Sequence, residues 1–179
     1  ILSNHTEFPV YFFDDYTEKM TAYTDKWKEL GLSFDAVATG FLGSEAQIEI
    51  VMDMIRKLES EETFVVVDPV MGDHGHAYET YTPEMCEQMK ELVCMADIVL
   101  PNVTECCILT DTPYKKENWT RRELLNMAMM LRLMGAKSVV ITGVREGSYY
   151  TNVVLERGQM EAKFIRTRSS GGERPGTGD

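Results

Sequence analysis

Hydrophobic residues along the chain fall into two alternating kinds of segment. In the first kind they recur every three or four residues, as on the buried face of an amphipathic helix. This pattern predicts helices over 14–31, 44–60, 82–96 and 120–135. In the second kind, apolar residues form short unbroken runs, which are typical of strands buried inside a parallel sheet. These runs predict strands over 34–40, 63–70, 97–102 and 138–143.

Residues that begin and end helices stand at the borders of the periodic segments. Ser44 with Gln47, and Thr120 with Glu123, have the spacing of a capping box, in which each side chain bonds the backbone N–H of the other residue. Gly135 follows the last periodic residue, where glycine commonly ends a helix. The helix borders are therefore predicted by two independent signals.

The order of these segments predicts an α/β fold with a mostly parallel sheet. Segments 148–156 and 160–167 instead alternate apolar and polar residues, as an antiparallel pair with one solvated face does. The polar, glycine-rich stretch 168–175 predicts a mobile loop. We find no internal repeat and expect one domain over 1–179. Both ends fall inside predicted structure, so we expect this domain to be truncated at both ends.

Composition narrows the choice of partners and compartment. The net charge is −11, from 18 Lys and Arg against 29 Asp and Glu, which disfavours nucleic acid and anionic membrane surfaces. The apolar runs are too short to cross a bilayer, and no signal-peptide pattern opens the chain. The four cysteines lack metal-binding spacing and are expected to be packed, reduced thiols. We therefore expect a cytoplasmic protein.

Polar side chains follow the predicted strands at their carboxyl ends, where parallel sheets bind ligands. Asp68 and Asp73 follow one strand, and Asn102 and Glu105 follow the next. These oxygen donors are the ligands that Mg²⁺ prefers, especially where it also bridges phosphates. An alternative remains for each: Asp68 suits a turn before a proline, and Asn102 and Glu105 suit the cap of a helix.

The last four residues, Gly176-Thr177-Gly178-Asp179, have the composition of an anion-binding turn. At the start of a helix, such a turn directs backbone N–H groups toward one point, where the helix dipole favours negative charge. Asp179 would then lie beside a bound phosphate and could accept a proton from an attacking hydroxyl. A general base of this kind typically adds about 10²–10⁴-fold to the rate.

Several segments together resemble pyridoxal kinases of the ribokinase-like superfamily. They are, in order, SNHT, VVVDPVMGD, ADIVLPNVTE, VVITG and GTGD. The resemblance runs from Ile1 to Asp179, and DPVMGD is specific to the vitamin-kinase branch. It implies a ribokinase-like three-layer α/β/α domain and transfer of the γ-phosphoryl group of ATP, with Mg²⁺, to the 5′-hydroxyl of pyridoxal, pyridoxine or pyridoxamine. It also implies a homodimer.

The resemblance further implies roles for individual residues. Asp179 matches the proton acceptor, and Gly176, Thr177 and Gly178 match the anion hole. The positions that match the ATP site are Asp68, Asn102, Glu105, Thr142 and Gly143. Asp73 and Glu105 match metal-site positions. The positions that match the substrate site are Thr6, Phe41 and Tyr78, with Tyr78 on a flap over the phosphates.

Two departures and two alternatives accompany this reading. Leu100 stands where close relatives have threonine, so a hydroxyl that would help to hold a monovalent cation is missing. Phe41 stands where the family often has tyrosine, which keeps ring stacking but removes the phenol.

A hydroxymethylpyrimidine kinase of thiamine biosynthesis is the enzymatic alternative, although Gly72-Asp73 favours the B6 branch. A non-catalytic ligand-binding relative is the other.

Overall fold

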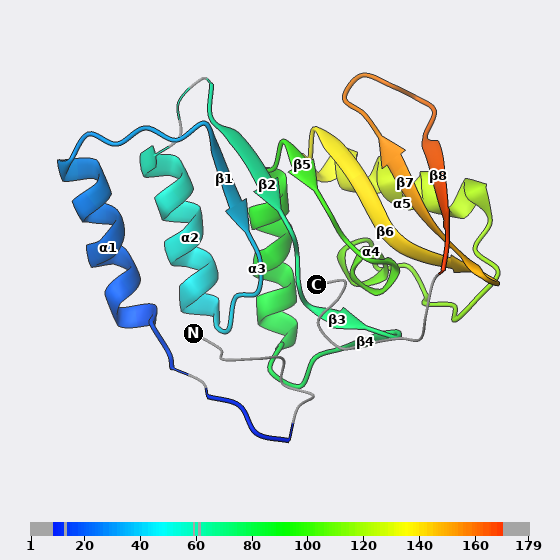
Figure 1. Cartoon of the computed structure of the whole chain (residues 1–179), viewed down its shortest axis with the longest axis horizontal. Helices are drawn as coiled ribbons and strands as arrows, with labels where there is room; N and C mark the ends of the chain where they lie inside the picture. The colour runs from blue at the N-terminus through cyan, green and yellow to red at the C-terminus, as the bar shows by residue number, and fades with distance from the viewer. Residues whose placement is uncertain (1–8, 13, 59, 61, 170–179) are drawn as a thin grey trace.

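The computed structural model describes residues 9–12, 14–58, 60 and 62–169. The helices are α1 (Thr17–Glu29), α2 (Glu45–Leu58), α3 (Pro83–Cys94), α4 (Val103–Leu109) and α5 (Arg121–Met134). The strands are β1 (Ala36–Thr39), β2 (Phe64–Val67), β3 (Gly72–Asp73), β4 (His76–Ala77), β5 (Ile98–Val99), β6 (Ser138–Glu146), β7 (Tyr149–Leu155) and β8 (Lys163–Arg168). Each predicted helix and strand corresponds to one of these elements (Figure 1).

A single large sheet organises the molecule, with strand order β1-β2-β5-β6-β7-β8. The first four strands in this order are parallel, and β7 and β8 continue the sheet in antiparallel pairing. Strands β3 and β4 form a separate two-stranded hairpin. The predicted α/β fold with a mostly parallel sheet and an antiparallel tail is confirmed.

One face of the sheet is buried and the other is partly exposed. Along β2, Val65 and Val67 are 3% and 0% exposed, whereas Phe64 is 44% exposed and Val66 is half-buried. Helices α1, α2, α3 and α5 contact one another in turn, and α3 and α5 lie behind the strands in Figure 1. Within the described residues, the helices therefore form one layer. The described residues therefore show the sheet and one helical layer of the predicted three-layer architecture.

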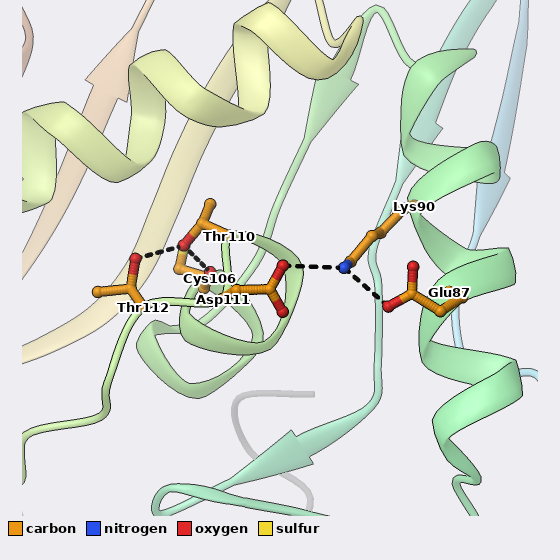
Figure 2. Close-up of polar contacts among 6 residues, drawn as sticks. All are labelled: Glu87, Lys90, Cys106, Thr110, Asp111 and Thr112. Atoms are coloured by element: carbon orange, nitrogen blue, oxygen red, sulfur yellow. Dashed lines mark hydrogen bonds and ion pairs between the residues drawn. The ribbon is translucent and has the colours of Figure 1, made fainter.

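The helical layer is held together by apolar packing and by a few polar bridges. The ammonium group of Lys90 on α3 contacts Glu87 at 2.8 Å and Asp111, just beyond α4, at 3.2 Å (Figure 2). In the same region, the hydroxyl of Thr110 donates to the carbonyl of Cys106 at 2.6 Å. None of the helices in the described part of the chain is long and apolar enough to cross a membrane.

The two predicted capping boxes formed to different extents. That of α5 is complete. At α2, the Ser44 hydroxyl accepts the N–H of Gln47 at 3.2 Å, but the Gln47 side-chain oxygen accepts the N–H of Gly43 instead of that of Ser44. The Gln47 amide nitrogen also donates to Thr17 and Asp15, at 2.8 and 3.1 Å. A glutamine has this second, donating end, and here it joins α2 to the start of α1.

Two strand lengths differ from the prediction for local reasons. β5 covers only Ile98–Val99, because the proline that follows has no N–H to continue the ladder. β6 extends past Gly143 to Glu146, because a bulge at this glycine (φ 66°) lets the strand pair with β7 beyond it. Arg168 belongs to β8, so the loop predicted over 168–175 begins too early; residues 170–175 lie outside the described part.

Candidate active site

A cavity of about 210 Å³ lies at the carboxyl edge of the parallel strands. Its lining residues are Asp68, Val70, Tyr78, Leu100, Asn102, Glu105 and Thr142. They come from the segment between β2 and β3, from the residue after β4, from the connection between β5 and α4, from the first turn of α4, and from β6. Five positions assigned to the ATP or substrate site from the sequence are thus brought together at one place.

Asn102 and Glu105 form a capping box at the start of α4. The Asn102 side-chain oxygen accepts the N–H of Glu105 at 2.9 Å, and the Glu105 carboxylate accepts the N–H of Asn102 at 2.7 Å. The capping alternative raised from the sequence is therefore realised. Capping does not use all the hydrogen-bonding groups of either side chain, because each also bonds the backbone at the base of the β3–β4 hairpin.

These additional contacts fix the hairpin to α4. The second oxygen of Glu105 accepts the N–H of Met71 at 3.2 Å, and the Asn102 amide donates to the carbonyl of Gly72 at 2.8 Å. Asn102 also forms an isolated parallel bridge with Thr142. The capping box therefore joins three walls of the cavity: the start of α4, the hairpin and the middle of β6.

The environment of Glu105 is unusual for a carboxyl group. Its side chain is only 3% exposed, and burial raises its pKa to about 8. The two N–H groups that it accepts oppose this rise, while the negative charges of Asp68 and Asp73 add to it. The cavity therefore concentrates carboxyl groups in a place where a bound cation would relieve their repulsion.

The residues present fit a loosely held Mg²⁺ better than a closed metal cage. Within the described ranges, no group of three or more His, Cys, Asp and Glu side chains is arranged to hold a metal ion. Mg²⁺ often needs only one or two carboxylates, because waters and substrate phosphates complete its shell. Asp73 and Glu105 remain the predicted metal-site residues. The Asp73 side chain is 52% exposed and accepts the N–H of His74 at 2.7 Å.

The other predicted site residues either do not line the cavity or lie outside the described residues. Phe41 follows β1, is 40% exposed and does not line the cavity. Gly143 is adjacent to Thr142 at the β6 bulge, and its N–H donates to Asn152 at 3.2 Å. The predicted residues outside the described part are Thr6, Gly176, Thr177, Gly178 and Asp179.

Neither the β3–β4 hairpin nor the residue that holds its tip was predicted from the sequence. The N–H of Gly75 donates to the hydroxyl of Thr104 at 2.9 Å. His74 and Gly75 have φ values of 52° and 86°, so both occupy the left-handed region that a two-residue hairpin turn requires. The His-Gly pair was the available signal, but strands of two residues leave no periodicity to read.

Comparisons with known proteins place the chain in a family. The sequence profile of the phosphomethylpyrimidine kinase family matches residues 26–179. A pyridoxal kinase of Dictyostelium discoideum is 31% identical over 150 residues, covering 80% of this chain and 47% of that protein. The chain spans about half the length of the curated relatives it matches.

A solved structure gives the same result at the level of the fold. A Bacteroides thetaiotaomicron protein assigned to the phosphomethylpyrimidine kinases is 36% identical, with a TM-score of 0.93 over 98% of this chain and 61% of its own. Another crystal form of that protein contains pyridoxal and aligns with a TM-score of 0.87, covering 93% of this chain and 59% of its own. The resemblance to vitamin kinases is confirmed, and the chain belongs to the phosphomethylpyrimidine kinase family.

Proposed function

We propose that this protein phosphorylates the 5′-hydroxyl of a B6 vitamer (pyridoxal, pyridoxine or pyridoxamine) with ATP, giving the 5′-phosphate. The observation that carries the proposal is the cavity at the carboxyl edge, where the Asn102–Glu105 box meets Asp68, Tyr78 and Thr142. Support for a B6 vitamer over a pyrimidine comes from the similarity to pyridoxal kinases and to a protein crystallised with pyridoxal.

The residues of the cavity would act mainly by positioning and by electrostatics. Thr142 and Tyr78 line the cavity, and each carries a hydroxyl group of the kind that hydrogen-bonds phosphate oxygens. Mg²⁺ held by Asp73 and Glu105 would supply neutralisation of phosphate charge. The predicted base, Asp179, would accept the proton of the vitamer hydroxyl as the bond to phosphorus forms, while Gly176, Thr177 and Gly178 would hold the transferred group by backbone N–H groups.

Several finer features are part of the same proposal. A homodimer follows from the resemblance, and a cytoplasmic location follows from the expected reduced thiols. A monovalent cation beside ATP would have to bind without the hydroxyl that Leu100 replaces. The negative net charge of −11 argues against nucleic acid and anionic membranes as partners.

The test is ATP consumption by the intact protein at millimolar Mg²⁺, with pyridoxal, pyridoxamine or hydroxymethylpyrimidine as acceptor. We expect turnover that depends on a B6 vitamer, and a 5′-phosphate product by mass spectrometry. A strong preference for the pyrimidine would move the protein to the thiamine branch. Absence of turnover on all three acceptors would instead favour a ligand-binding protein that shares the fold.

A further inference from the structure

The β3–β4 hairpin is too short to be stable by itself. Its two strands contribute only two residue pairs, Gly72 with Ala77 and Asp73 with His76. Isolated hairpins are marginal in water even when they are longer. A backbone bond from the N–H of Tyr78 to the carbonyl of Met71, at 2.9 Å, closes the base. The position of the hairpin must therefore depend on contacts with the rest of the fold.

These contacts come from the first turn of α4. Asn102 and Glu105 hold the base of the hairpin, as described above. Thr104, between them in sequence, holds the tip through the Gly75 N–H at 2.9 Å. Thr104 is only 2% exposed, so its hydroxyl lies in a region where a lost hydrogen bond is not replaced by water.

The tip of the hairpin also rests on an aromatic ring. A Cβ placed on Gly75 would lie 2.4 Å from Cδ1 of Tyr114, so the ring is in direct contact with the glycine backbone. Tyr114 in turn meets Trp119 edge-on, with ring centroids 6.5 Å apart. The indole N–H of Trp119 donates to the carbonyl of Lys115 at 2.8 Å. The tip of the hairpin thus contacts both a buried hydroxyl and a supported ring.

We propose that Thr104 and Tyr114 are positioning residues that clamp the β3–β4 hairpin against the cavity. The hairpin carries Asp73 and leads directly into Tyr78, which lines the cavity. If the tip is released, Asp73, which is next to the turn, loses its fixed place relative to Asn102 and Glu105, and Tyr78 depends on the contacts at the base of the hairpin. The consequence for kinetics rests on the proposed function, whereas the clamp itself does not.

Amide hydrogen exchange tests the clamp without reference to activity. Thr104→Val keeps the shape but removes the acceptor, and we expect exchange at Gly75 to become about threefold to tenfold faster, the effect of one net hydrogen bond. Thr104→Ser keeps the hydroxyl and should restore slow exchange. Tyr114→Leu, at a position that is 36% exposed, should also speed exchange and serves if Thr104→Val does not fold.

Thr110→Val is the matched control. Thr110 is also buried, at 5% exposure, and its hydroxyl bonds Cys106 and Thr112 at the other end of α4, away from the hairpin (Figure 2). It should lower stability without changing exchange at Gly75. Equal exchange in wild type and Thr104→Val, or an equal effect of Thr110→Val, would overturn the clamp.

Kinetics of the intact protein then test its consequence. A displaced hairpin lowers the fraction of protein molecules that can bind ATP. Thr104→Val should therefore raise the KM for ATP by up to the factor by which it speeds exchange at Gly75, and change kcat by less than about twofold. If Thr104→Val and Thr110→Val both lower kcat and leave KM unchanged, Thr104 has only a structural role, and the proposal that it positions the hairpin is wrong. If the wild type has no kinase activity, the proposed function fails, and the exchange comparison alone decides whether the clamp exists.

Discussion

Glu105 and Glu123 occupy the same position of two capping boxes, yet their carboxyl groups behave in opposite ways. Burial raises the pKa of Glu105 to about 8. Hydrogen bonds from Lys115 and Thr120 lower the pKa of the exposed Glu123 to about 2. Burial beside Asp68 and Asp73 does not strengthen a helix cap, because it disfavours the ionised form of the glutamate. The difference between these two residues is therefore the strongest residue-level sign that Glu105 serves the cavity as well as the helix.

This comparison gives a paired test of the metal role. We expect Glu105→Gln to raise the Mg²⁺ concentration needed for half-maximal kinase rate, because a carboxylate near the metal is lost. Glu123→Gln alters the equivalent residue of α5, which does not line the cavity, and should leave this requirement unchanged. An Mg²⁺ titration of the rate checks both. If wild type and Glu105→Gln need the same Mg²⁺ concentration for half-maximal rate, Glu105 has no role at the metal and only caps the helix.

The lowered pKa of Glu123 also predicts that stability depends on pH. Its pKa is lower in the folded state than the ordinary value of 4.5, so its contribution is fully present above pH 4.5 and is lost as pH falls through about 2. The stability gap between wild type and Glu123→Gln should therefore shrink as pH is lowered from 7 to 3. Urea denaturation at several pH values measures this gap. A gap that stays constant would show that Lys115 and Thr120 do not favour the ionised form.

At the scale of elements, the predictable features were those with a local cause. Helix borders followed from caps, and the buried strands of the parallel sheet followed from runs of β-branched residues. The sequence also indicated that Asp68, Asn102 and Thr142 stand at the carboxyl ends of parallel strands, so their meeting at one edge could be expected. The β3–β4 hairpin could not, because its stability comes from Thr104 and other side chains about 30 positions later in the chain. Such partners become visible only in three dimensions.

The turn of this hairpin allows a second paired test. Gly75→Ala would meet the Tyr114 ring in addition to the strain of a positive φ, whereas Gly147, with φ 62°, has no atom within 4 Å of an added Cβ. We expect Gly147→Ala to cost about 1–2 kcal/mol from backbone strain alone. Gly75→Ala should cost clearly more, because the ring must move. Urea denaturation of both variants measures the difference, and equal losses would show that Tyr114 does not support the turn.

At the scale of the whole molecule, the sheet has one packed face and one face that the described helices leave partly open. On the open face, Ala38 is paired with Val66, and Val66 with Ile98; Ala38 is exposed and the other two are only half-buried. Phe64 lies on the same face and is 44% exposed. These side chains are contiguous across three strands, which makes them an apolar patch and not a scatter of single residues.

This patch should be detectable when the chain is produced by itself. We expect it to bind a hydrophobic dye, and Phe64→Thr to reduce the dye signal while helix content stays the same. Leu133→Gln changes a single apolar side chain on α5 that is 87% exposed, and should have little effect. Fluorescence titration with circular dichroism as a control checks this. If both variants reduce dye binding equally, the open face is not the binding surface.

The half-open sheet also has a thermodynamic consequence. The heat capacity of unfolding grows with the apolar surface that becomes hydrated, and it is about 2.1–2.7 kcal/mol/K for a typical domain of 179 residues. Side chains that are already hydrated before unfolding, such as Phe64, add little to this increment. For the chain alone, calorimetry should therefore give a value below that range. Its free energy of unfolding should then change less steeply with temperature, so that cooling and warming from the optimum both weaken the fold only gradually.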